Sequence, residues 1–411
     1  MLAEIYCSLA LLVAPQDTLR VSMDGAEKMF AEKNLLILAQ SYQVEATKAL
    51  EIQARLYPNA QLSGEINAID RQHEKYFNVG PQGQKAFQIE QLILLGGKRK
   101  KEMELARQNS MIASLEFEDL LRNLKLELHN TLYDVYFDQS AVRGFNQQLT
   151  LLDSIIVSYD RQAKKGNIPY KEVIRLKSIY IRINNEKTNF IKEILEGQKK
   201  LQVLLQSPGY VAPEINVNTW AKFERQHPID SLVNIALDLR PDYKISKANI
   251  NYANLNLQYQ RRLAVPDVSL GGDYDQRGGA FVNQVGLMFS MPLPLTNRNQ
   301  GNIKAAEHQA KAVVTLEQQA KSEITAHVTN SWLALNRSVQ EYAKARTMYN
   351  ADFTTVFNGV SENFQKRNIT LLEFVDFFES YNETVINMNH IERQVALSAE
   401  QLNYSIAYPL Y

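Results

Sequence analysis

With 411 residues and 45 basic side chains against 45 acidic ones, the chain has no charge excess to attract nucleic acid and no acidic tail. Its single cysteine, Cys7, excludes an intramolecular disulfide and a thiolate metal cluster. An apolar run at residues 5–14 predicts an atypical or truncated signal segment over 1–18, with an ordinary buried segment as the alternative.

The sequence repeats itself about two hundred residues later. The segment 166–173, GNIPYKEV, returns as RNITLLEF at 367–374, and TLY at 131–133 returns as SWL at 331–333. We therefore expect one architecture made of two similar structural repeats, at residues 24–210 and 228–406.

The first repeat begins with helical periodicity over 24–56, which Pro58 ends. Apolar and polar residues then alternate at about 59–69 and again at about 85–95, which predicts a pair of strands. After these strands, apolar residues recur every three or four positions, and no proline interrupts the stretch. This pattern predicts a long helix over about 98–163 and a return helix over about 170–206.

The second repeat has the same order. Residues 231–263 are helical in pattern, and alternation predicts strands at about 265–275 and 280–292. A second stretch without proline predicts a long helix over about 300–365, followed by a return helix over about 371–404.

Each expected strand has about the length that a tilted strand needs to cross a bilayer, with one apolar and one polar face. Four strands cannot close a barrel, and three chains would supply twelve, so we expect homotrimeric assembly. The alternative is a soluble β-sandwich inserted between helices.

Two local motifs sharpen this interpretation: LGGKR at 95–99, after the second strand, and PLPLTNRNQG at 292–301, after the fourth. With these motifs and the order of its elements, the chain resembles the TolC family of trimeric outer-membrane efflux ducts from Asp24 to Tyr404. The motifs are similar to those of its heavy-metal branch, which contains CzcC- and CusC-like proteins. That branch usually has an aromatic residue where Thr296 stands.

The resemblance implies a mainly α fold with a small membrane β part. Long helices would form an α-helical barrel across the periplasm, and four strands per chain would contribute to a twelve-stranded trimeric β-barrel in the outer membrane of a Gram-negative-type bacterium. It also implies a periplasmic adaptor and an inner-membrane pump of the RND type as partners. The expected function is that of the outer-membrane channel in a tripartite system that exports metal cations or other small toxic solutes.

Three groups of residues are candidates for a functional or architectural role. Glu373 and Asp376 share a helical face, Glu172 is the equivalent of Glu373 in the first repeat, and the resemblance places these carboxylates at the periplasmic mouth. The alternative is an ordinary solvated helix face.

The turns and expected adaptor contacts involve Gly166, Asn167, Phe364, Arg367 and Asn368; Arg367 stands where the family has glycine. The strand-to-helix junctions contain Gly96, Gly97, Pro292, Pro294, Asn297 and Asn299, for which we expect a purely architectural role.

The sequence contains no signal of catalysis, of a bound metal or of a cofactor. Its six histidines are dispersed, and no two lie four apart on a helix.

Two other protein classes are alternatives to a channel. A periplasmic adaptor has one helical hairpin where this chain has two, and a coiled-coil scaffold does not explain four amphipathic strands.

Overall fold

The computed structural model describes residues 18–215, 227–278, 280–349 and 351–410. The chain divides into two compact units. Unit 1 comprises residues 1–39, 118–240 and 322–411, and unit 2 comprises residues 40–117 and 241–321. Within the described ranges, no helix is both long and apolar enough to span a bilayer. Apart from Thr18, the expected signal segment at 1–18 lies outside the described residues.

The first half of the chain contains β1, α2 to α5 and β2 to β6. Its elements are β1 (Thr18–Ser22), α2 (Met23–Lys33), α3 (Leu35–Arg55), β2 (Gln61–Ile66), β3 (Ile69–Asp70), β4 (Lys75–Tyr76), β5 (Gln84–Ile93), α4 (Lys98–Lys164), α5 (Tyr170–Leu205) and β6 (Tyr210–Glu214). The second half contains α6 (Ile229–Leu239), α7 (Pro241–Leu263), β7 (Val268–Arg277), β8 (Phe281–Ser290), α8 (Gln300–Met348), α9 (Ala351–Gln365) and α10 (Leu371–Ile406). The small strands β1, β3, β4 and β6 have no counterpart among the sequence predictions.

Each expected first helix is in fact two helices. Asn34 separates α2 from α3: its Oδ1 accepts hydrogen bonds from the backbone amides of Leu36 and Ile37, which caps α3. Arg240 and Pro241 separate α6 from α7, since a proline inside a helix removes a backbone donor and fits well at its first position. The helical stretches expected over 24–56 and 231–263 are therefore each divided into two helices.

The two interruptions are anchored in the same way. Asn34 donates from Nδ2 to the carbonyl of Leu204, at 3.0 Å, and Arg240 donates from Nη1 to the carbonyl of Ser405, also at 3.0 Å. These acceptors lie in the last turns of α5 and α10, the return helices of the two repeats. Equivalent positions in the two halves thus make equivalent contacts.

The long helix expected over 300–365 is also interrupted. The structure divides it into α8 and α9, between Met348 and Ala351. At the interruption, Tyr349 lies against Phe353, with ring centroids 5.1 Å apart, and Phe353 stacks on Tyr381 of α10 at 5.9 Å. Ring contacts from Tyr349 through Phe353 to Tyr381 therefore link the interruption to the return helix.

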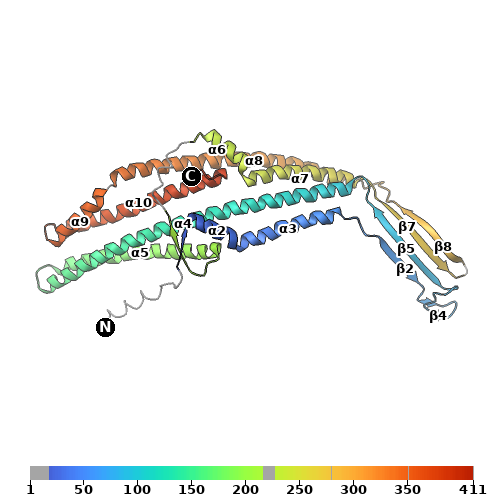
Figure 1. The fold of residues 1–411 in the computed structure, drawn as a ribbon, viewed down its shortest axis with the longest axis horizontal. Coiled ribbons are helices and arrows are strands. Elements are labelled where there is room, and N and C mark those ends of the chain that lie inside the picture. The colour runs from blue at the N-terminus through green and yellow to red at the C-terminus, as the bar shows by residue number, and fades with distance from the viewer. Residues whose placement is uncertain (1–17, 216–226, 279, 350, 411) are drawn as a thin grey trace. The chain divides into compact units, whose positions relative to one another are not determined.

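Unit 2 contains a four-stranded antiparallel sheet in the order β2-β5-β7-β8 (Figure 1). Because residues paired across antiparallel strands point to the same face, the registers assign each side chain to one side. One face is apolar and exposed within the chain, and carries Leu62, Phe87, Ile89, Leu270, Val285, Leu287 and Phe289. The opposite face carries Glu65, Gln88, Glu90, Asp273, Asp275 and Gln284.

The edges of this sheet are the strands β2 and β8, each of which pairs with one neighbour within the chain. A strand edge with free backbone donors and acceptors is a template for pairing with another chain. Among the described residues, nothing covers the apolar face of this sheet or pairs with its two edges.

Candidate functional site at the helix turns

The two turns that join long helices to return helices lie in unit 1 and have the same backbone geometry. Gly166 adopts a left-handed φ of 75°, and its counterpart Arg367 adopts a φ of 62°. In the first turn, the amides of residues 166 and 167 donate to the carbonyls of residues 163 and 162, at 2.9 and 3.0 Å. In the second, the amides of residues 367 and 368 donate to the carbonyls of residues 364 and 363, at 3.0 and 2.9 Å. Both turns are Schellman motifs.

Equivalent asparagines close both turns with their side chains. Asn167 donates from Nδ2 to Oε1 of Gln162 at 2.7 Å, and Asn368 donates from Nδ2 to Oδ1 of Asn363 at 3.0 Å. Arginine in place of glycine at 367 therefore leaves the turn intact, at the cost of a left-handed conformation that side chains with a Cβ disfavour.

We expect Arg367→Gly to stabilise the folded protein by about 1 kcal/mol, because glycine relieves the left-handed strain. The reciprocal change, Gly166→Arg, should destabilise it by a similar amount. The urea midpoint of unfolding should therefore rise for Arg367→Gly and fall for Gly166→Arg, relative to the parent. A midpoint for Arg367→Gly at or below that of the parent would show that Arg367 makes a compensating contact.

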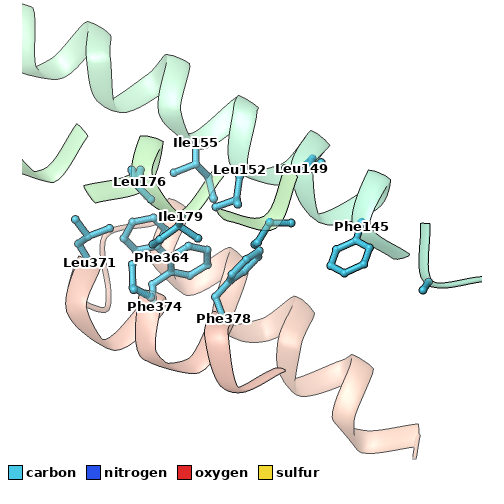
Figure 2. Packing of buried hydrophobic residues seen from close by; sticks show 13 residues of the cluster. Phe145, Leu149, Leu152, Ile155, Leu176, Ile179, Phe364, Leu371, Phe374 and Phe378 are labelled. Atoms are coloured by element: carbon cyan, nitrogen blue, oxygen red, sulfur yellow. The ribbon is translucent and has the colours of Figure 1, made fainter. Parts of the chain in front are cut away.

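A buried aromatic stack supports the turns from inside. Phe364 is 1% exposed, and its ring stacks on Phe374 at 4.2 Å and on Tyr159 at 5.3 Å between centroids. Figure 2 shows the rings of Phe364 and Phe374 beside Leu152 and Ile155 of α4 and Leu176 of α5. Phe364 therefore belongs to the core that joins the two hairpins and positions the surface above it.

That surface is a groove of about 690 Å³ formed by residues from both turns. Ile168, Glu172, Arg367, Asn368 and Glu373 are among the residues that line it. Its remaining lining residues are Ser154, Ile155, Ser158, Tyr159, Gln162, Phe364, Gln365, Ile369, Thr370 and Leu371. The structure thus brings two of the three predicted carboxylates, Glu172 and Glu373, to one groove. Asp376 is exposed and is not part of its lining.

Glu373 has a local structural role that its spacing from Thr370 already encodes. Its Oε2 accepts hydrogen bonds from the backbone amide and the hydroxyl of Thr370, at 2.7 and 2.8 Å, while Thr370 accepts from the amide of Glu373. This is a capping box at the start of α10. The backbone hydrogen bond from Thr370 lowers the pKa of Glu373, so its carboxylate stays charged to lower pH than usual.

The surroundings of the carboxylates differ in charge. The first turn is basic: residues 160–177 carry six basic side chains, Arg161, Lys164, Lys165, Lys171, Arg175 and Lys177, against Asp160 and Glu172. The second turn is acidic, because residues 362–379 carry Glu362, Glu373, Asp376 and Glu379 against Lys366 and Arg367. A concentration of negative charge is therefore a property of the second turn alone.

The junction residues lie in unit 2, away from the turns along the sequence. Gly96 and Gly97 have φ angles of 69° and 75°, and a Cβ on Gly96 would lie 3.0 Å from the side chain of Val265. Pro292 and Pro294 follow the end of β8. Asn297 accepts from the amide of Asn299, and Asn299 donates from Nδ2 to the carbonyl of Gln260 in α7, at 2.8 Å. These contacts fix where strands become helices.

Sequence reasoning missed a buried charge cluster further along unit 1. The ring nitrogens of His129 in α4 lie 2.8 Å from Oε1 of Glu27 in α2 and 2.9 Å from Oε2 of Glu400 in α10. Burial alone would lower the pKa of His129, but the bonds to both carboxylates outweigh it and raise the pKa to about 9. No local pattern could reveal this cluster, because its members are far apart in sequence.

Comparison with known proteins gives one consistent result. No protein-family model matches the chain. The chain is 20% identical to the cobalt-zinc-cadmium resistance protein CzcC of Cupriavidus metallidurans over 369 residues, which cover 87% of this chain and 82% of CzcC.

The fold is similar to those of solved outer-membrane channels. A structure of CusC aligns with a TM-score of 0.74 and 15% identity, over 93% of this chain and 91% of CusC. The CmeC outer membrane channel of Campylobacter jejuni aligns with a TM-score of 0.76 and 13% identity, over 94% of this chain and 86% of CmeC. The chain therefore has the TolC-like fold of outer-membrane efflux channels and is similar in sequence to a cobalt-zinc-cadmium resistance protein.

Proposed function

We propose that this chain is the outer-membrane channel of a tripartite efflux system, with a role in transport and none in catalysis. Three copies form the channel, which extends into the periplasm and works with a periplasmic adaptor and an inner-membrane pump of the RND type. Metal cations are the favoured substrate class, because CzcC is a cobalt-zinc-cadmium resistance protein; other small toxic solutes are the alternative.

The observation that carries this proposal is the sheet of unit 2. Its apolar face is uncovered within the chain, with Leu287 96% and Val285 76% exposed, while the opposite face is polar and acidic. A soluble protein rarely leaves so large an apolar surface exposed, whereas strands in a membrane need one face toward lipid. The two open edges favour completion of the sheet by further copies.

Cell fractionation tests the proposal against its alternatives. A channel is expected in the outer-membrane fraction and to need detergent for extraction. A soluble periplasmic pool would favour an adaptor, and a soluble cytosolic pool would favour a coiled-coil scaffold; either result would contradict the proposal.

We further propose that Glu373 and Asp376 form the cation-attracting ring at the periplasmic mouth. Three copies of the acidic second turn would bring these carboxylates together near one axis, where negative charge attracts cations and repels anions. Glu172 contributes less, because the basic residues of the first turn compensate its charge. The turns themselves, with Gly166, Asn167, Arg367 and Asn368, are the proposed contact region for the adaptor.

The double variant Glu373→Gln with Asp376→Asn should lower cation selectivity and weaken block by multivalent cations in planar-bilayer recordings. Glutamine at 373 retains an oxygen for the capping box, so assembly should be unchanged. Glu172→Gln is the control, and its selectivity should stay close to that of the parent. Unchanged selectivity in the double variant would mean that these carboxylates are an ordinary solvated helix face.

A further inference from the structure

The helix end of the four-stranded sheet carries a basic surface that the proposed function does not use. Four segments meet there: residues 51–58, 95–104, 257–267 and 293–307. Together they contain nine basic and five acidic side chains. At the opposite end of the sheet, residues 67–83 contain two of each. The excess of basic over acidic side chains is thus greater at the end where strands become helices.

Hydrogen bonds and ion pairs hold the four segments together within unit 2. Arg99 donates from Nη1 to the carbonyl of Arg55 at 2.8 Å, which joins α4 to the end of α3. Lys98 and Asp267 form an ion pair at 2.7 Å, which joins α4 to the start of β7. The bond from Asn299 to Gln260 joins the start of α8 to α7. The four segments that carry the basic side chains are therefore joined at one end of the sheet.

Most of the acidic groups at this junction are already neutralised. Asp267 pairs with Lys98, Glu307 with Arg261 at 2.9 Å, and Glu104 with Lys101 at 2.6 Å. Glu51 lies 4.0 Å from Arg55. The excess charge consequently belongs to the remaining basic side chains, among which Lys100, Arg262 and Arg298 are exposed.

Apolar and aromatic groups lie among these cations. The guanidinium of Arg99 lies 3.7 Å above the ring of Tyr57, which is 69% exposed. Leu293 and Leu295, which follow β8, are 69% and 78% exposed. This composition, with cations, a tyrosine and leucines at the end of an apolar face, is typical of a membrane–water interface. There, aromatic rings and the aliphatic parts of long side chains contact acyl chains, and the charged ends contact lipid headgroups.

We propose that this surface binds anionic phospholipid headgroups of the periplasmic leaflet, such as phosphatidylglycerol. This inference rests on the proposed function, since it requires the apolar face of the sheet to lie in a bilayer. The cations would then lie at the level of the lipid phosphates, and basic side chains near an anionic surface strengthen binding severalfold each. A bound lipid would fix the depth and tilt of the sheet in the membrane.

The test uses the full chain purified in detergent and reconstituted into vesicles of phosphatidylcholine, with or without phosphatidylglycerol. Flotation on a density gradient measures insertion, and mass spectrometry of the lipids retained after re-extraction measures selectivity. We expect the parent to insert and to retain phosphatidylglycerol preferentially. The triple variant Lys100→Gln, Arg262→Gln, Arg298→Gln should insert but lose this preference by roughly tenfold or more at low salt.

A triple variant matched in charge, Arg143→Gln, Arg175→Gln, Lys192→Gln, removes exposed cations of unit 1 and should keep the preference. Equal retention by the junction variant and the parent would overturn the inference, and so would loss of the lipid on addition of inorganic phosphate, because the site would then bind free anions. Insertion without lipid preference would contradict this inference alone. Failure to float with either vesicle would contradict the proposed function as well.

Discussion

Leu287→Arg is expected to abolish stable assembly in the outer membrane, although this side chain makes almost no contact within its own chain. Leu287 is 96% exposed and lies in the middle of β8, on the apolar face of the sheet. In water, a substitution at so exposed a position changes stability by only about 0.5 kcal/mol or less. On a lipid-facing strand, an arginine near the bilayer midplane costs about 2–4 kcal/mol per chain.

Gln284→Arg provides the matched control, because residue 284 is exposed on the same strand but faces the polar side, opposite Asp275. The yields of heat-resistant oligomer in the outer-membrane fraction compare the two variants. We expect loss for the first and near-parental yield for the second. Equal yields of both variants would mean that the apolar face does not contact lipid.

The second large effect is a loss of stability at alkaline pH that depends on His129. The cluster around this side chain contains Glu27, Glu400, Lys125 and Tyr133. Because the folded protein raises the pKa of His129 from 6.5 to about 9, the protonated ring stabilises the fold fully below pH 6.5. That contribution, about 3 kcal/mol, should be lost as the pH rises through 9.

The same cluster also makes the stability of the folded protein decrease at low pH. The hydrogen bond from His129 is the main reason that the pKa of Glu27 falls to about 2, so the contribution of Glu27 is present above pH 4.5 and is lost as the pH falls through 2. The contribution of His129 to stability is measured as the difference between the urea midpoints of unfolding of the parent and of His129→Gln, from pH 5 to 10. A difference that does not change between pH 6.5 and 9 would show that the ring is not protonated in the folded protein.

Local periodicity predicted the main elements because, in the strands and in the long helices, the two faces of each element lie in different environments. The alternation that gave four strands reflects a sheet with one apolar and one polar face. The interruptions at Asn34 and Pro241 were missed for different reasons. Pro241 is a direct local signal that the helical pattern on both sides obscured, whereas Asn34 acts through a side-chain cap and a bond to Leu204, which is distant in sequence.

The candidate site was predictable where its residues act locally. The repeat located both turns, and the spacing of Thr370 and Glu373 is itself a capping-box signature. The aromatic stack around Phe364 was only partly visible, since its partners Tyr159 and Phe374 come from α4 and α10, and tertiary packing alone brings them together. The pairing of β1 with β6 likewise depends on contacts across nearly the whole first repeat.

The mass of the purified protein in mild detergent tests the central claim most directly. One chain has a mass of 47.0 kDa, and its described residues leave the edges β2 and β8 open. If copies complete the sheet together, the folded protein should have three times the mass of one chain once bound detergent is subtracted, and dissociation should coincide with loss of strand structure. A folded monomer that keeps its strands and long helices would contradict the proposal that this chain builds a channel by shared assembly.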